Sequence, residues 1–220
     1  MTKVRVHIGT KVIRDLRANP SVIIRMLRRI LITKRLYPTG HHGINRFIGG
    51  GMSEAALRWA LRELTYHITD VSHLNRVDIN VEFEGFEGVP FSVKYSCSNA
   101  SIILQNYHGK KSDKVEPIHP SIFILVDLEK SNATILFLTQ GLVDASEYTG
   151  TRITQNDANV SFPRPFINHL VKKLGDDFCL TVPLPTDIPV VTQVDIFEEL
   201  ILPDADRRLA EYDAQRALQH

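Results

Sequence analysis

Apolar and polar residues alternate from position 76 to position 84, which is the two-residue period of a strand with one buried face. Glycines at both ends of the segment 85–88 can adopt the left-handed backbone conformations of a tight turn. The return strand is expected at 89–97, so the pattern predicts a β-hairpin. Pairing the strands about the middle of the turn brings Asp78 opposite Lys94 on the polar face, at the roughly 5 Å spacing of cross-strand neighbours. A register shift of one residue would separate them onto opposite faces.

Helical spacing of apolar residues predicts two helices before this hairpin. The first is a basic amphipathic helix at 22–34 that follows Pro20. A glycine-rich loop is expected at 37–51, and Ser53 then has the side chain of an N-cap residue for the second helix. Further elements are expected as strands at 121–127, 133–139, 178–182 and 190–196, a short helix at 165–174 and a charged helix at 204–218. This order predicts an α/β fold, with α+β as the alternative, in which helices flank a central mixed β-sheet.

Length and composition predict a single domain. The 220 residues can bury one core, and 43% hydrophobic and 23% charged residues are ordinary for a soluble globular protein. We divide the chain into a basic helical segment (1–48), a core segment (49–140) and a mixed C-terminal segment (141–220). Its apolar runs are too short to span a bilayer and its N-terminus lacks a signal-peptide core, so we expect a cytoplasmic protein without membrane contact. Cys97 and Cys179 are expected to be small buried hydrophobes.

Charge is distributed unevenly along the chain. Residues 1–62 contain thirteen Lys and Arg and two acids, whereas residues 176–220 contain ten acids and three Arg. Clustered Lys and Arg can neutralise phosphates, so we expect the basic segment to contact nucleic acid. The side chains predicted to contact DNA are Arg25, Arg28, Arg29, Lys34, Arg35, Arg46, Lys110 and Lys111. The alternative is that the basic and acidic ends of the chain pair with each other.

The polar face of the hairpin carries candidate chemistry for phosphodiester hydrolysis. Mg²⁺ takes hard carboxylate oxygens as ligands, lowers the pKa of an attacking water and stabilises the charge that develops on the phosphate. Asp78 can supply one ligand, and Lys94 can orient the water and stabilise the transition state. Each residue also has a structural interpretation, because an acid can flank an edge strand and a strand lysine can simply be solvated.

A helix that bears a glutamate, an aspartate at the start of a hairpin and a D/E-x-K tripeptide on the next strand resemble the PD-(D/E)XK nuclease superfamily, which includes many type II restriction endonucleases. The matching residues here are Glu54 after the glycines at 49–51, Asp78 after Val77, and Ser92-Val93-Lys94. The resemblance implies a restriction-endonuclease-like fold and a Mg²⁺-dependent, sequence-specific endonuclease that cleaves double-stranded DNA. Because a double-strand cut needs one site for each strand, we expect a homodimer. The resemblance also implies that Asp78, Glu54 and the backbone carbonyl of Val93 bind the metal, and that Lys94 assists the water.

The chain departs from the family pattern at two positions. No proline precedes Asp78, and Ser92 stands where the family has an acid. Some members of the superfamily take a missing carboxylate from another element, and Glu54 is our first choice for it. A purely stabilising role in the first turn of its helix would also explain Glu54. The alternatives for the second carboxylate are Glu63, Glu82 and Glu84.

Two other functions are consistent with the same residues. A non-catalytic nucleic-acid-binding protein would use the basic segment to hold a phosphate backbone, and its binding would be salt-sensitive without metal-dependent cleavage. A viral or structural assembly protein would instead pair its basic segment with the acidic tail of a neighbouring subunit.

Overall fold

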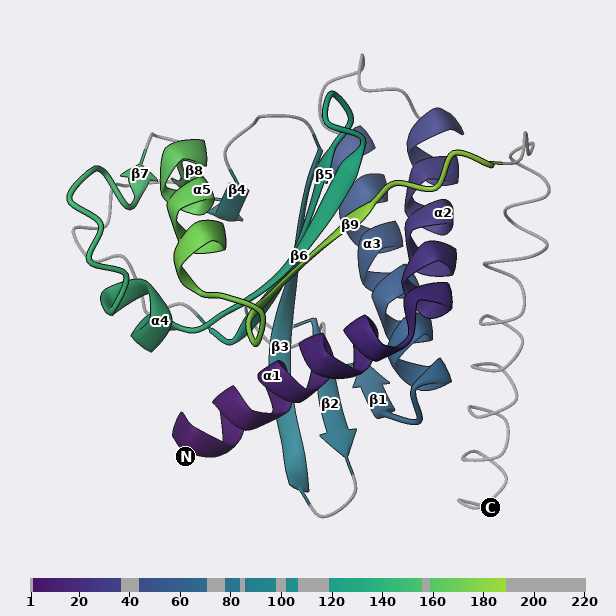
Figure 1. Ribbon diagram of the computed structural model, residues 1–220, viewed down its shortest axis with the longest axis horizontal. Coiled ribbons are helices and arrows are strands. Elements are labelled where there is room, and N and C mark those ends of the chain that lie inside the picture. The colour runs from purple at the N-terminus through teal and green to yellow at the C-terminus, as the bar shows by residue number, and fades with distance from the viewer. Residues whose placement is uncertain are drawn as a thin grey trace, which may run out of the picture.

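The chain folds into two β-sheets with helices on both sides of the larger one (Figure 1). The computed structural model describes residues 2–36, 44–70, 78–83, 86–97, 102–106, 119–155 and 159–188. Its helices are α1 (Thr2–Ala18), α2 (Pro20–Leu36), α3 (Ile44–Glu63), α4 (Gln140–Asp144) and α5 (Arg164–Lys173). Its strands are β1 (His67–Asp70), β2 (Ile79–Phe83), β3 (Phe86–Cys97), β4 (Ile102–Asn106), β5 (Ser121–Asp127), β6 (Asn132–Leu138), β7 (Thr154–Gln155), β8 (Asn159–Phe162) and β9 (Cys179–Pro183). The predicted α/β class is therefore confirmed.

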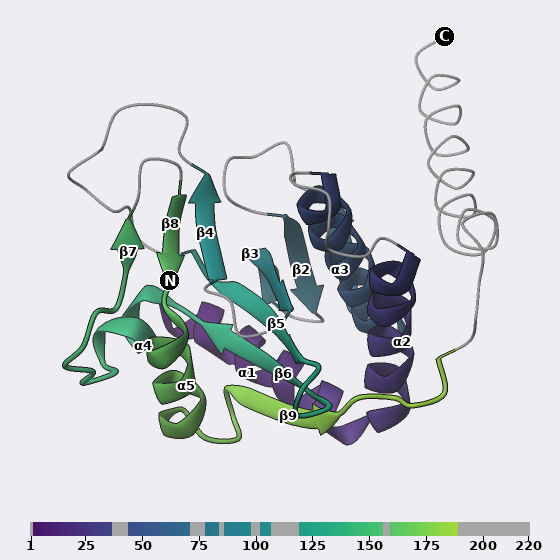
Figure 2. The ribbon, with the colours of Figure 1, turned by 90° about the horizontal axis from the view of Figure 1, so that it is seen from above.

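The larger sheet is mixed. Its strand order is β1-β2-β3-β5-β6-β9, in which β3 and β5 run parallel and every other neighbouring pair is antiparallel. All seven residues of the central strand β5 are buried, as expected for a strand covered on both faces. A smaller antiparallel sheet, β4-β8-β7, stands beside it (Figure 2).

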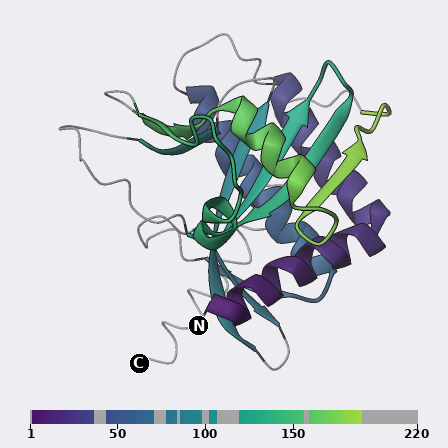
Figure 3. The same ribbon diagram turned by 60° about the vertical axis from the view of Figure 1, so that its left-hand side comes forward.

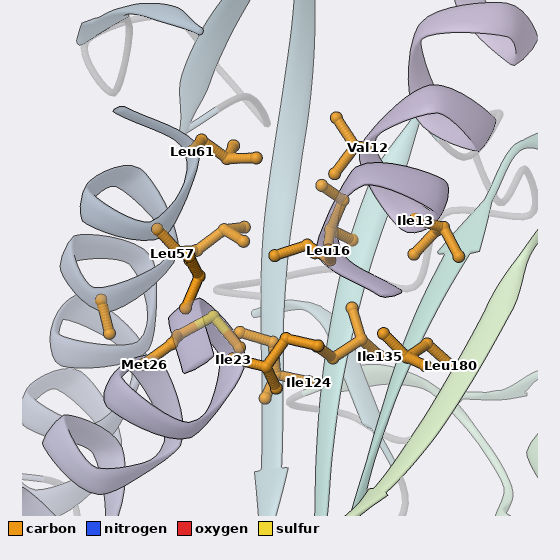
Figure 4. Packing of buried hydrophobic residues seen from close by; sticks show 14 of the residues in the cluster. Val12, Ile13, Leu16, Ile23, Met26, Leu57, Leu61, Ile124, Ile135 and Leu180 are labelled. Atoms are coloured by element: carbon orange, nitrogen blue, oxygen red, sulfur yellow. The ribbon is translucent and has the colours of Figure 1, made fainter. Parts of the chain in front are cut away.

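Alternation along the strands divides the core into two clusters. Strand residues such as Ile124 and Ile135 pack with α1, α2 and α3, which contribute Leu16, Met26 and Leu57 (Figure 4). Ile79 and Phe91 belong to the same cluster. The other face of the sheet packs with α5 and the smaller sheet. Figure 3 shows α5 in front of the sheet and α2 and α3 behind it. The face that carries Phe91 is therefore the helix face of α1–α3, and the next residue along β3 faces the opposite way.

Most of the predicted elements are confirmed, with corrected boundaries. The hairpin, the basic helix, the strands at β5, β6 and β9 and the short helix α5 are all present. The predictions at 37–43, 190–196 and 204–218 lie outside the described residues. Helices α1 and α4 and strands β1, β4, β7 and β8 had not been assigned from the pattern.

The start of α3 was predicted wrongly. Ser53 does not cap this helix, because α3 begins at Ile44 and passes through the glycines at 49–51, leaving Ser53 fully buried in its interior. Glycine is an unfavourable helix residue, but packing of the apolar face against the core outweighs propensity. Glu54 is consequently a mid-helix residue, and the interpretation that it stabilises the first turn is wrong.

The hairpin register also differs from the prediction. Ile79 pairs with Phe91 and Val81 with Val89, so Asp78, next before Ile79, lies beside Ser92 rather than opposite Lys94. Pairing continues, after an irregularity, to Phe83 and Phe86. The difference is two residues, which preserves the face of every side chain. Gly88 suits this register, since a Cβ there would lie 2.2 Å from the side-chain nitrogen of Asn80.

Basic residues of the first two helices pair with acids far along the chain. Arg14 lies 3.6 Å from Asp177 and Arg17 lies 3.5 Å from Asp176. Arg28 on α2 pairs with Asp187. These contacts agree with the interpretation that the two oppositely charged ends of the chain pair with each other.

Candidate active site on strands β2 and β3

The Asp78 carboxylate binds the backbone and a side chain of the neighbouring strand. Its own N–H donates to the carbonyl of Phe91 at 2.9 Å, which holds it at the beginning of β2. Its Oδ2 accepts a hydrogen bond from the N–H of Val93 at 2.6 Å and another from the hydroxyl of Ser92 at 3.0 Å. Just before β2 begins, the Asp78 carboxylate thus takes the place of a β2 backbone carbonyl as the acceptor for β3.

The backbone of Val93 faces the same edge as Asp78. The N–H of Ser92 donates to Pro120 on the β5 side at 2.9 Å, whereas the N–H of Val93 donates to Asp78 on the β2 side. The N–H and C=O of one strand residue point to the same edge, and successive residues alternate. The Val93 carbonyl, which the resemblance implies as a metal ligand, is therefore directed to the edge where the Asp78 carboxylate lies.

Lys94 lies beside the Asp78 carboxylate. Its Nζ lies 3.9 Å from Asp78 Oδ2, and the exposed fractions of the two side chains are 24% and 26%. Lys94 shares a face of β3 with Ser92, because the two are separated by one residue. The predicted association of Asp78 with Lys94 on one face is thus found, as a diagonal pair rather than a directly opposite one.

Ser92 occupies the position where the resemblance calls for an acid. It is 2% exposed, and its hydroxyl is a donor to Asp78. A carboxylate at this position would place two negative charges side by side unless a cation lay between them. The sequence identified the substitution, but it gave no indication that Ser92 would contact Asp78.

Glu54, the predicted second carboxylate, lies on a helix that packs on the other face of the sheet. Helix α3 packs through residues such as Leu57 on the helix face, with Phe91, whereas Lys94 lies on the opposite face. The Glu54 carboxylate pairs with Arg58, one turn further along the same helix. A metal-binding role for Glu54 therefore remains a prediction, which requires the Glu54 carboxylate to reach the face of the sheet that carries Asp78 and Lys94.

The alternative carboxylates have other neighbours. Glu63 accepts a hydrogen bond from Arg25 at 2.8 Å. Glu82 accepts one from Asn80 at 2.9 Å and lies 3.9 Å from the His67 ring. Glu84 lies outside the described residues. Of these acids, Glu82 shares a strand and a face with the candidate site, since it is four residues from Asp78.

Four of the eight basic side chains predicted to contact DNA lie in the described part of the chain, and each of these contacts another protein group. The guanidinium of Arg29 stacks 4.3 Å over the ring of Trp59, and burial lowers the pKa of Arg29. The hydrogen bond from Arg25 to Glu63 raises the pKa of Arg25. Arg28 pairs with Asp187, and Lys34 contacts Cys97. The side chains of Arg35, Arg46, Lys110 and Lys111 lie outside the described residues.

The donor set is compatible with Mg²⁺, which commonly binds through one or two carboxylates and retains several waters. Both described hydrogen bonds to the Asp78 carboxylate end on Oδ2. Asp78 Oδ1 and the Val93 carbonyl are hard oxygen donors at one edge. Among the described residues, no group of three or more His, Cys, Asp and Glu side chains is arranged around a common point.

Comparisons with protein-family models, with curated proteins and with solved structures found no match. The site is therefore interpreted from its own geometry. No helix in the described part of the chain is both long enough and apolar enough to cross a membrane.

Proposed function

We propose that this protein is a Mg²⁺-dependent DNA endonuclease whose active site lies on β2 and β3. The observation that carries the proposal is the convergence of the Asp78 carboxylate, the Lys94 ammonium and the Val93 backbone on one strand edge, with 3.9 Å between Asp78 Oδ2 and Lys94 Nζ. A helix, an aspartate at the start of a hairpin and a lysine on the next strand are also the elements of the nuclease resemblance.

Each residue has a distinct role in this proposal. Asp78 Oδ1 and the Val93 carbonyl would hold the cation, which would lower the pKa of a water and neutralise charge on the phosphate. Lys94 positions the water and stabilises the negative charge that develops on the phosphate oxygens. The Ser92 hydroxyl orients the Asp78 carboxylate by donating to Oδ2. Glu54 remains our candidate for a further ligand.

The substrate proposed is double-stranded DNA, cleaved at a specific sequence by a homodimer. Two sites related by a twofold axis would each act on one strand, which is the simplest arrangement for a double-strand cut. Of the predicted contacts, Arg25 is 46% exposed despite its pair with Glu63, so it can exchange that partner for a phosphate.

A non-catalytic nucleic-acid-binding protein is the second candidate. It is favoured by the hydrogen bonds of Asp78, because a carboxylate that receives Val93 N–H and Ser92 Oγ–H has a structural role without any metal. In that case Lys94 would balance the charge of Asp78.

Cleavage of mixed-sequence plasmid and phage DNA distinguishes the two functions. The wild type, Lys94→Ala and the control Lys130→Ala would each be incubated with DNA in Mg²⁺ or in EDTA. Lys130 also pairs with an aspartate, but it lies in the turn after β5 and its side chain is 68% exposed. The nuclease predicts discrete fragments that require Mg²⁺, persist in Lys130→Ala and vanish in Lys94→Ala. DNA that stays intact but is retarded on a gel at low salt would establish the binding protein instead.

A further inference from the structure

A lysine and a cysteine from distant parts of the chain meet between α2 and β3. Lys34 lies near the end of α2 and Cys97 is the last residue of β3. The Nζ of Lys34 donates to the Sγ of Cys97. Both side chains are half-buried, so small solutes can reach them. Cys97 is therefore partly buried against the core, not fully buried as predicted.

Tyr95 adds a third polar group to this pair. It lies two residues before Cys97 on the same face of β3. Burial, together with the charge of Cys97 and a hydrogen bond to it, raises the pKa of Tyr95. The phenol consequently stays protonated at neutral pH and can donate to the sulfur. Cys97 thus has two polar neighbours, the Lys34 amine and the Tyr95 hydroxyl, and the amine nitrogen contacts its sulfur.

Cys179 provides an internal comparison. It is 7% exposed on β9, and burial raises the pKa of its thiol. Its side-chain hydrogen bond is to Thr181, whose side chain carries a hydroxyl and no nitrogen. The two cysteines therefore differ in access and in the chemistry of their neighbours.

We infer that Lys34 and Cys97 form a site of reversible oxidative cross-linking, in which peroxide converts their contact into a covalent sulfur–nitrogen bond. In the first step the Cys97 thiolate attacks hydrogen peroxide, the S–O bond forms and the O–O bond breaks. The departing hydroxide takes a proton from the Lys34 ammonium and becomes water. The free amine then attacks the sulfenic acid, the S–N bond forms and the S–O bond breaks. That hydroxide takes a second proton from the nitrogen, so one peroxide yields one cross-link and two waters.

The Lys34 amine determines whether the Cys97 sulfenic acid forms the cross-link or is oxidised further. A sulfenic acid without a nearby nucleophile can be oxidised further to the irreversible sulfinic acid. Lys34 Nζ already contacts the sulfur, so condensation within the pair competes with that reaction. The product would fasten α2 to β3 on the helix face of the sheet, opposite to Lys94. This inference is independent of the proposed nuclease activity.

The test is peptide mapping of the full chain after treatment with one equivalent of hydrogen peroxide. The expected product is a chain lighter by two hydrogens, in which the Lys34 peptide is joined to the Cys97 peptide and trypsin no longer cleaves after Lys34. Dithiothreitol should restore both peptides. Cys179→Ser should still form the cross-link, whereas Cys97→Ser should not.

Lys34→Arg tests the nucleophilic nitrogen of Lys34 separately from its positive charge. A guanidinium keeps the positive charge but is a poor nucleophile, so this variant should accumulate sulfenic acid that dimedone traps on Cys97. Wild-type chain that gives the same dimedone adduct with no cross-link would overturn the inference. Peroxide products confined to sulfinic acid, or to a Cys97 disulfide between two chains, would do so as well. Because mapping of the wild type is decisive alone, poor folding of a variant does not weaken the test.

Discussion

Replacing Asp78 with alanine should destabilise the fold, whatever its role in catalysis. The substitution removes the acceptor of two hydrogen bonds, from Val93 N–H at 2.6 Å and from the hydroxyl of Ser92 at 3.0 Å. Hydrogen bonds to a charged group contribute about 1.5–3 kcal/mol each. The Asp78 side chain is 26% exposed, so water can replace part of this loss, and we expect a net loss of roughly 2–3 kcal/mol.

Urea denaturation measures this loss, and the single tryptophan, Trp59, provides a fluorescence signal. With a slope of about 3 kcal/mol per molar urea for a chain of this size, the urea midpoint of unfolding should fall by roughly 0.7–1 M. Asp78→Asn keeps an oxygen acceptor for one of the two donors, so its midpoint should fall by about half as much.

The control for this series is Glu147→Gln. Glu147 also pairs with a lysine, Lys173, but its side chain is 83% exposed, so the midpoint should stay within error of the wild type. If Asp78→Ala unfolded at the wild-type urea concentration, the carboxylate would not hold β3 as described.

Three further predictions concern separate parts of the structure. Ser92→Asp, which puts a second acid beside Asp78, should lower the melting temperature without metal and increase the rise caused by Mg²⁺; an unchanged response to Mg²⁺ would count against a metal site here. Gly9→Ala would place a Cβ 2.2 Å from the Phe137 ring and should cost about 1–3 kcal/mol, whereas Gly50→Ala, in α3 with nothing within 4 Å, should gain about 0.5–1 kcal/mol; equal effects in urea would refute this packing. Hydrogen bonds and charge from Lys130, with Arg164 nearby, lower the pKa of Asp127, so its stabilising effect should be complete above its ordinary pKa and lost as pH falls through the lowered one; Asp127→Asn should flatten the acid limb of a stability–pH curve.

Elements with a strong period were predictable from the sequence. The apolar positions of α2 recur at helical spacing, and those of β2 alternate, so local geometry determined both. The run at β5 was recognisable as a strand because it is short and four of its seven residues, Ile122, Phe123, Ile124 and Val126, are β-branched or aromatic. The class of fold followed from these elements and their order.

The start of α3 could not be predicted from local signals, which favoured Ser53 as a cap. Three consecutive glycines normally mark a loop, and tertiary packing overrode that preference here. Helix α1 was missed, although the helical spacing of Ile8, Val12 and Leu16, all of which are buried, could have indicated it.

The candidate site was predictable in part. Alternation placed Asp78 and Lys94 on one face, because the side-chain period of a strand is two. Their exact register depends on how far the strands pair toward the turn, which alternation does not determine. The contact between Lys34 and Cys97 joins residues 63 positions apart, and no local pattern reports such a contact.

The central claim is tested most directly by the rate at which supercoiled plasmid DNA is cut in Mg²⁺ by the wild type and by Asp78→Asn, at a temperature where both are folded. Asparagine retains the shape of the side chain and removes the charge that would hold the cation. The nuclease account predicts Mg²⁺-dependent nicked and linear products from the wild type and their loss in the variant. Equal cutting by the two proteins, or plasmid left intact by the wild type in Mg²⁺, would contradict it.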